Sequence, residues 1–270
     1  MELRKPASLD AFREEALPLL LEYEIEHGLI FSITNAPNPP ADAYCSLVVH
    51  DGEVVAAALR TIKKAALSRE KMPGAIALIA ADALKDPKLQ GVLGPQASVE
   101  AFAAASGRQW KEGMAQGIYE CLNVIPPPKV PGARRVTTPS DRALLALWIR
   151  DFVREAGGEN PTLDEATASA DRHIASGKTY FWVVDGEPVS YAGAYNLTPN
   201  GVRVGPVYTP PEHRRRGYAG ALVAEVTQRE LNDGRAFAYL YTNLKNPTSN
   251  ALYQRIGYRR VGEAVDYWMV

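Results

Sequence analysis

The second half of the chain alternates between two hydrophobic patterns. Apolar residues recur at the 3.6-residue spacing of a helix over residues 140–155, 163–176 and 213–231, and again over 247–256. Short apolar runs bounded by turn residues predict strands, which cover residues 179–184, 189–195, 202–209, 236–241 and 258–269. The order α, α, β, β, β, α, β, α, β is typical of an α/β unit with a mixed sheet.

A weaker version of the same order occupies the first half of the chain. Strands are predicted over residues 44–49, 54–60, 92–93 and 118–124, and helices over 74–84 and 97–105. In each half an Asp-Gly pair, Asp51-Gly52 or Asp185-Gly186, joins the first two strands in a hairpin. An amphipathic helix from Ser8 to Gly28 precedes the first hairpin. We therefore predict a duplicated fold.

A run of prolines divides the two halves. Residues 126–132 read Pro-Pro-Pro-Lys-Val-Pro-Gly, and proline fixes φ and lacks an amide hydrogen. Such a segment cannot be the middle of a helix or of a central strand. We predict a linker over residues 126–136, between a domain over residues 1–125 and a second domain over residues 137–270.

The composition excludes several classes of function. Apolar residues make up 46% of the chain and the net charge is −1, so nothing global favours a nucleic acid or an anionic membrane. Cys45 and Cys121 have no metal-like spacing, which indicates reduced thiols in a cytoplasmic protein without a metal. The apolar run near the N-terminus is too short and too charged for a signal peptide or a membrane span.

The strongest chemical signal lies between Val207 and Gly220. A strand is predicted to end at Thr209 and a helix to begin near Arg215, and the first amide hydrogens of a helix are unpaired and partly positive. Small residues leave room at this helix end, and consecutive arginines add positive charge for an anionic ligand. These residues are Gly217, Ala219 and Gly220, and Arg214, Arg215 and Arg216.

A second segment, residues 243–258, follows one strand downstream. Asn246 suits the N-cap of a helix, Pro247 suits its first position, and Gly257 suits the position after its end. Tyr253 lies one turn before that end. It is either a buried packing residue or the residue that brings chemistry to this segment.

Both segments resemble motifs of a known family. Arg214-x-x-Gly217-x-Ala219 is similar to the Arg/Gln-x-x-Gly-x-Gly/Ala motif of the GNAT N-acetyltransferases. The segment with Asn246, Asn250 and Tyr253 looks like that family's second CoA-contacting segment. The resemblance covers roughly residues 138–270. It implies, with the weaker first half, a tandem GNAT-like acyl-CoA N-acyltransferase fold of the α/β class.

The resemblance also implies roles for these residues. In the family, the loop binds the pyrophosphate of acetyl-CoA, the preceding strand holds the pantetheine and thioester, and a tyrosine protonates the departing thiolate. Tyr253 is then the catalytic residue, since a phenol of pKa about 10 is protonated at neutral pH. The implied contacts with acetyl-CoA are Val207, Tyr208, Thr209, Arg214, Arg215, Arg216, Gly217, Tyr218, Ala219, Gly220, Asn243, Asn246, Asn250 and Tyr253.

The activity that the resemblance implies is acetyl-CoA-dependent N-acetylation without a metal. The acceptor is a primary amine of a small molecule or a peptide, which attacks the thioester directly. Two alternatives stay open: a non-catalytic acyl-CoA sensor, and a transferase of a longer acyl or aminoacyl group. Tyr253 beside an intact loop favours an enzyme, and the near-neutral charge disfavours a nucleic-acid partner.

The base that accepts the proton of the amine is not identified by the sequence. Many relatives carry a glutamate on the strand before the loop, but residues 202–207 contain no carboxylate. The candidates are Glu187, Asp151, Glu155 and His173. An oxyanion donor is expected in the backbone near Thr209. An aromatic hairpin either lines the acceptor site or belongs to the core; it comprises Tyr180, Phe181, Trp182, Tyr191 and Tyr195.

The first half of the chain departs from the family pattern. No Arg-x-x-Gly-x-Gly/Ala occurs around residues 72–74. Ala103 stands four residues before Gly107, where the second half has Tyr253 before Gly257. We therefore expect that the first half does not bind CoA and that it packs on the second half as a wall of the acceptor cleft.

Overall fold

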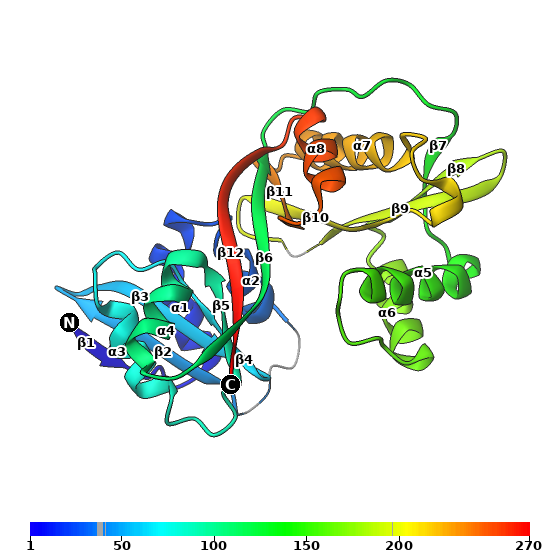
Figure 1. Ribbon diagram of the computed structural model, residues 1–270. Helices are drawn as coiled ribbons and strands as arrows, with labels where there is room; N and C mark the ends of the chain where they lie inside the picture. Colours follow the sequence, from blue (N-terminus) through cyan, green and yellow to red (C-terminus); the bar gives the residue numbers. More distant parts are fainter. Residues whose placement is uncertain (37–39, 41, 196) are drawn as a thin grey trace.

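The computed structural model describes residues 1–36, 40, 42–195 and 197–270, and its elements fall into two runs of the same order (Figure 1). The N-terminal repeat comprises β1 (Glu2–Arg4), α1 (Leu9–Glu22), α2 (Gly28–Thr34), β2 (Tyr44–His50), β3 (Glu53–Arg60), β4 (Lys64–Leu67), α3 (Ala75–Ala83), β5 (Gly91–Pro95), α4 (Gln96–Ser106) and β6 (Trp110–Cys121). The C-terminal repeat comprises β7 (Ala133–Val136), α5 (Arg142–Glu155), α6 (Leu163–Ala175), β8 (Thr179–Val184), β9 (Glu187–Tyr195), β10 (Gly201–Tyr208), α7 (Tyr218–Asn232), β11 (Phe237–Asn243), α8 (Pro247–Arg255) and β12 (Arg259–Met269). The predicted α/β class and the duplication are confirmed.

The N-terminal helix prediction was wrong about where that helix ends. Ser8 does cap α1, because its hydroxyl accepts the amide hydrogen of Ala11 at 3.1 Å. The helix ends at Glu22, however, and Gly28 begins the separate helix α2. The intervening turn, residues 23–27, is held by contacts with the other repeat, which a local pattern does not contain. The pattern also missed β1, β4 and β7, which are three or four residues long.

All strands join one twelve-stranded sheet, in the order β1-β2-β3-β4-β5-β12-β6-β11-β10-β9-β8-β7. The last strands of the two repeats are exchanged. β12, which ends the C-terminal repeat, pairs with β5 of the N-terminal repeat from Ala264–Pro95 to Trp268–Gly91. β6, which ends the N-terminal repeat, pairs with β11 from Cys121–Ala238 to Gln116–Asn243. Figure 1 shows β6 and β12 as a long ribbon between the two halves of the molecule.

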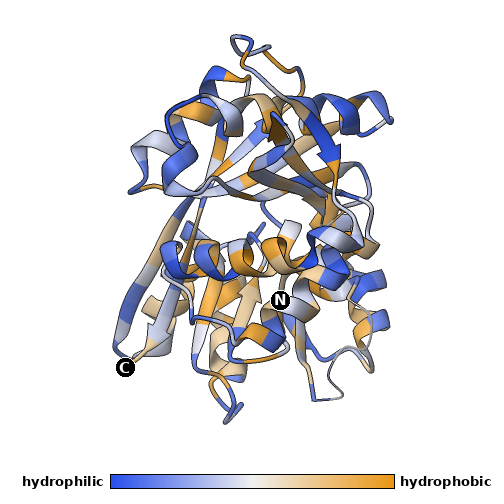
Figure 2. Cartoon of the chain, turned by 90° about the vertical axis from the view of Figure 1, so that its right-hand side faces the viewer, coloured by the Kyte–Doolittle hydropathy of each residue, from blue (hydrophilic) through white to orange (hydrophobic). Residues whose placement is uncertain are grey.

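Helices cover both faces of the sheet in each repeat. In the N-terminal repeat, α3 and α4 bury one set of apolar side chains, including Ile79 and Phe102, and α1 and α2 bury another on the opposite face, including Phe12 and Phe31. Each such side chain contributes about 1.5–3 kcal/mol when it leaves water. Figure 2 shows the hydrophobic positions mainly on the strands and the inner faces of the helices. The described helices include none that is long and apolar enough to span a membrane.

The turn between α1 and α2 lies against the C-terminal repeat. The carboxylate of Glu24 is buried there and accepts hydrogen bonds from the backbone and side-chain amides of Asn200, at 2.8 and 2.7 Å. The Tyr241 hydroxyl donates to the carbonyl of Ile25 at 2.9 Å. These bonds fix one repeat against the other at the start of β10 and along β11.

The proline-rich segment crosses the outer side of the C-terminal repeat. Residues 126–132 contain no helix or strand, whereas residues 133–136 form β7 beside β8. The segment is tied at both ends: Ile125 donates its amide hydrogen to Ile256, and the Trp182 indole donates to Pro131. The segment therefore lies close to α7 and α8 and is held in place at both ends.

Candidate functional site

Two parallel strands of the C-terminal repeat separate from each other. β10 and β11 are paired only from Gly201–Phe237 to Arg203–Tyr239, although β10 continues to Tyr208 and β11 to Asn243. The pairing of β10 with β9 also shifts register between Val204 and Val207. This bulge turns β10 away from β11, so that a wedge-shaped opening forms in the middle of the sheet.

Gly205 makes this bulge possible. Its φ of 145° is in the region that side chains rarely adopt, and a β carbon at this position would point into open space. The opening contains a cavity of about 1530 Å³. Small-molecule sites usually measure about 300–1,000 Å³, so this one has room for an extended ligand and a second molecule beside it.

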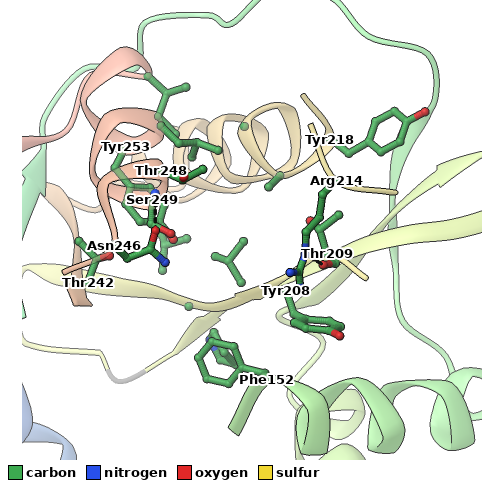
Figure 3. Close-up of a pocket in the computed structure, with 18 of the residues that line it drawn as sticks. Phe152, Tyr208, Thr209, Arg214, Tyr218, Thr242, Asn246, Thr248, Ser249 and Tyr253 are labelled. Carbon is green, nitrogen blue, oxygen red and sulfur yellow. Dashed lines mark hydrogen bonds between the residues drawn. The ribbon is translucent and has the colours of Figure 1, made fainter. Parts of the chain in front are cut away.

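Residues from two sides of the opening face each other across the cavity. Figure 3 shows Asn246, Ser249 and Tyr253 on the α8 side, and Tyr208 and Arg214 on the side of β10 and the following loop. Twelve of the residues predicted to contact a ligand line this cavity. Arg216, which is exposed, and Asn250 do not.

The loop after β10 presents its backbone to the cavity. Arg215 and Gly217 have positive φ angles of 64° and 85°, and α7 begins only at Tyr218. The prediction of a helix from residue 213, or from near Arg215, was therefore wrong, because left-handed residues cannot continue a helix. Gly217 offers no side chain as a cap, and the first-turn amides of α7 cannot bond within the helix. The loop thus presents a concave set of amide hydrogens.

Arg214 lines the cavity and also holds this loop in place. Its Nε donates to the carbonyl of Thr209 at 2.8 Å, and its Nη2 donates to both carboxylate oxygens of Glu155 at 2.7 Å. The hydroxyl of Thr209 lies 2.8 Å from that of Ser190. The end of β10 is therefore fixed to α5 and to β9.

The start of α8 is fixed in a comparable way. Asn246 caps the helix by accepting the amide hydrogen of Ser249 at 3.1 Å. The side-chain amide of Asn250 donates to the carbonyls of Asn243 and Asn246, at 3.1 and 2.8 Å, and its oxygen accepts from the Tyr119 hydroxyl at 3.1 Å. Asn250 therefore joins α8 to β11 and β6, while Asn243 and Asn246 line the cavity.

Tyr253 is the acidic group of the α8 wall. Its ring packs edge-on against Tyr258, with ring centres 5.9 Å apart, and it lines the cavity. Burial raises the pKa of the Tyr253 hydroxyl to about 12, because the phenolate would lose hydration. The hydroxyl is therefore protonated at neutral pH and can donate a proton into the cavity.

The structure separates the four candidate bases. Glu155 and His173 line the cavity, whereas Asp151 and Glu187 do not. Burial, together with the charge of Arg172, lowers the pKa of His173 to about 4, so its imidazole is neutral. Its Nδ1 lies 3.2 Å from the Tyr195 hydroxyl. The carboxylate of Glu155 is occupied by Arg214.

Of the aromatic hairpin, Tyr195 alone lines the cavity. The other four aromatic residues are buried in the two cores of the C-terminal repeat; they are Tyr180, Phe181, Trp182 and Tyr191. Sequence reasoning missed Arg203 and Tyr241, which also line the cavity, and Met114 and Gln116 of β6. The last two come from the other repeat through the strand exchange, for which the sequence holds no local signal.

Comparison with known proteins identifies the second repeat. Residues 142–258 match the sequence model of the acetyltransferase (GNAT) family. The C-terminal repeat is a GNAT domain. A comparison of the chain with curated proteins finds no match.

Solved structures extend the likeness to the whole chain. A GCN5-related N-acetyltransferase from Sphaerobacter thermophilus has a TM-score of 0.66 at 17% identity, over 98% of this chain and 94% of its own. A tandem GNAT protein from the clavulanic acid biosynthesis pathway has a TM-score of 0.59 at 16% identity, over 100% and 98%. A glucosamine N-acetyltransferase region of a fungal multi-domain β-N-acetylglucosaminidase has a TM-score of 0.61 at 11% identity, over 99% of this chain and 38% of that chain. The chain therefore has the tandem GNAT fold.

The N-terminal repeat differs from the C-terminal repeat at the equivalent strands and helix. A β carbon at Gly94 of β5 would lie 2.6 Å from the carbonyl oxygen of Leu67, so β4 and β5 stay together to the end of β4. The carboxylate of Glu70 accepts the amide hydrogen of Ile76 at 3.0 Å and so occupies the start of α3. An anion at this helix end would meet a negative charge.

Proposed function

We propose that this protein transfers an acetyl group from acetyl-CoA to a primary amine of a small molecule or a peptide. GNAT family membership supports acyl transfer in general. The observation that carries the finer proposal is one cavity that joins three features: the wedge between β10 and β11, the open amide end of α7, and the protonated hydroxyl of Tyr253.

The proposed contacts with acetyl-CoA follow the walls of this cavity. The amides of Gly217, Tyr218, Ala219 and Gly220 suit the pyrophosphate, with Arg215 as the nearby cation. The unpaired edge of β10, at Val207 to Thr209, suits the pantetheine arm, since it faces β11 without bonding to it. Asn243 and Asn246 stand on the opposite side. Arg214 and Asn250 act through the loop and the helix that they hold.

The reaction is an acyl transfer by direct attack. The neutral amine nitrogen bonds to the thioester carbonyl carbon, the carbon–sulfur bond breaks, and the nitrogen loses one proton. Tyr253 gives its proton to the departing sulfur and regains one from solvent. The proton of the amine leaves to water, and the neutral imidazole of His173, which lines the cavity, can accept a hydrogen bond from that water. The products are an amide and CoA with a free thiol.

Several further features are consistent with this proposal. The similar glucosamine N-acetyltransferase region acts on an amino sugar, which places amino sugars among the acceptors to test. Cys45 and Cys121 are free cysteines, as expected of a cytoplasmic enzyme. We propose that the N-terminal repeat, with Glu70 at the start of α3, does not bind CoA.

The role of Tyr253 is tested with acetyl-CoA and a broad panel of amines, by following the release of free thiol. We expect turnover by the unchanged protein, and a loss of about tenfold or more in kcat for Tyr253→Phe with unchanged affinity for acetyl-CoA. Phenylalanine keeps the packing against Tyr258 and removes only the proton. If kcat is equal for both proteins, Tyr253 is not the acid. If the protein binds acetyl-CoA tightly but turns over no amine, the enzymatic proposal is contradicted.

A further inference from the structure

Four side chains form a continuous row along the floor of the cavity, on the sheet face covered by α5 and α6. His173 of α6 contacts Tyr195 of β9, with ring centres 4.6 Å apart. Tyr195 stands directly opposite Arg203 of β10 in the antiparallel register, which places both side chains on one face. The guanidinium of Arg203 lies 4.9 Å from the ring centre of Tyr241 on β11. All four residues line the cavity.

This row lies beyond the end of the wedge that would hold the thioester. Arg203 precedes Gly205 by two residues, so the two positions share a face of β10 and are roughly 7 Å apart. Gly205 marks the bulge where β10 leaves β11, and the loop with Gly217 lies at the other end of the unpaired segment. A diphosphate at that loop therefore leaves Arg203 at the opposite end, where a second substrate meets the acyl group.

Arg203 carries a positive charge that is not directly paired. Its side chain is half-buried, and it forms no ion pair with a described carboxylate. Of the acidic groups of the nearby turn, Glu26 is paired with Arg69, and Glu24 accepts hydrogen bonds from the neutral amides of Asn200. A partly desolvated cation without a counter-ion is unfavourable, and the ring of Tyr241 offsets only part of that cost.

A second unpaired arginine faces the same end of the cavity. Arg172 precedes His173 on α6, lines the cavity, and forms no ion pair with a described carboxylate. Its charge acts on His173, the first residue of the row, whereas Arg203 is the third. Glu155, the carboxylate that lines this cavity, is held by Arg214. The acceptor end therefore presents two arginines that are not directly paired with a described carboxylate.

We propose that the acceptor amine carries a carboxylate, as an amino acid or a peptide C-terminus does, and that Arg203 binds this group. The planar guanidinium matches a carboxylate with two parallel hydrogen bonds, and Arg172 adds to the attraction. The amine of the same molecule then lies between Gly205 and His173. This inference rests on the proposed acetyl transfer. It predicts that amines without an anionic group, such as amino sugars, are poor acceptors.

The test compares acceptors that differ in the carboxylate, with kcat/KM expressed per unprotonated amine because the carboxamide also lowers the pKa of the amine. The common L-amino acids and their α-carboxamides are given to the full chain with saturating acetyl-CoA, and kcat/KM is measured for each pair. We expect that the best amino acid exceeds its carboxamide by at least about tenfold, because a charge-assisted bidentate contact is lost in the carboxamide. Equal kcat/KM within the pairs would overturn the inference and leave acetyl transfer intact.

Variants of Arg203 assign the effect to this residue. Arg203→Met should lower kcat/KM for the amino acid by at least about tenfold and leave the carboxamide unchanged, while Arg203→Lys keeps part of the preference. The matched control is Arg13→Met, since Arg13 is exposed on α1 in the other repeat and outside the cavity. If Arg203→Met lowers kcat/KM equally for both acceptors, Arg203 has a structural role only, and the inference is contradicted.

A binding measurement keeps the inference separate from the proposed function. If the unchanged protein turns over no amine, the CoA-loaded protein is titrated with each amino acid and its carboxamide by calorimetry. Binding of the amino acid alone, lost in Arg203→Met, would support the carboxylate site although acetyl transfer had failed. Equal binding of both, or binding of neither, would overturn it.

Discussion

Arg214 and Asn250 are two motif residues whose side chains bond to other parts of the protein. The guanidinium of Arg214 is bonded to Thr209 and Glu155, and the amide of Asn250 is bonded to β11 and to Tyr119 of β6. Each side chain fixes a stretch of backbone whose amides or neighbours line the cavity. The sequence motif therefore predicts where the site lies, whereas the structure shows which residues its side chains contact.

The pH dependence of the reaction follows from two groups, Tyr253 and His173. Burial raises the pKa of Tyr253 from about 10 to about 12, so its acidic form, which is the active one, is present up to at least pH 10.5. Burial lowers the pKa of His173 to about 4, so it is neutral above pH 6. We expect kcat/KM to rise with pH only as the amine loses its proton, near pH 8 for an α-amine, and then to stay level.

This profile is measured as kcat/KM from pH 6 to 10.5 with an acceptor of known pKa. A decline that begins near pH 9.5 to 10 would mean that Tyr253 titrates at its ordinary value, or that another acid is used. An inflection near pH 6.5 that is independent of the amine would mean that His173 is not buried as described.

At the scale of elements, the helix that follows β4 in one repeat and β10 in the other distinguishes the two repeats. α7 and α3 occupy equivalent places, and both start after a glycine of positive φ, Gly217 or Gly74. At α3, the carboxylate of Glu70 bonds to the first turn. At α7 the first turn is open to a cavity. The same helix start thus bonds to a side chain of the protein in one repeat and, in our proposal, binds the ligand in the other.

Gly217→Val tests this helix end. Valine at a φ of 85° is strained, and its β carbon would lie 2.9 Å from Cγ1 of Val130, so the loop must move. We expect affinity for acetyl-CoA to fall by at least about tenfold, measured by calorimetry.

The matched control is Gly234→Val, beyond the other end of α7. Gly234 has a similar φ of 94°, with open space around its added β carbon. The control shares the strain but not the site, so it should lower stability and keep the affinity. Equal affinities in both variants would contradict the role of the loop.

The sequence predicts the long elements well because their patterns are local. The helices near 142–155 and 163–175 and the strand over 179–184 follow from apolar spacing and turn residues alone. The bulge at Gly205 and the start of α7 at Tyr218 were not predicted, since they depend on positive φ angles within a loop. Of the site, the motif positions were found, while Arg203 and Tyr241 required knowledge of which strands are neighbours.

At the scale of the whole molecule, the exchange of β6 and β12 joins the two repeats into one unit. The edge of the C-terminal sheet beside β11 is completed by β6, and this strand supplies Met114 and Gln116 to the cavity. The turn over residues 23–27 holds β11 and the start of β10 from the other side. The N-terminal repeat thus contributes residues to the cavity of the C-terminal repeat, and the pairing partner of a strand cannot be read from its own residues.

The central claim is that one acetyl-CoA lies in the wedge between β10 and β11 with its pyrophosphate on the amides that open α7. The most direct measurement is a crystal structure of the full chain with acetyl-CoA. We predict one molecule per chain, with the pyrophosphate against Gly217 to Gly220, the thioester sulfur within hydrogen-bond distance of the Tyr253 hydroxyl, and the start of α3 free of ligand. Coenzyme bound at the N-terminal repeat, or anywhere that leaves the loop after Pro210 empty, would contradict it.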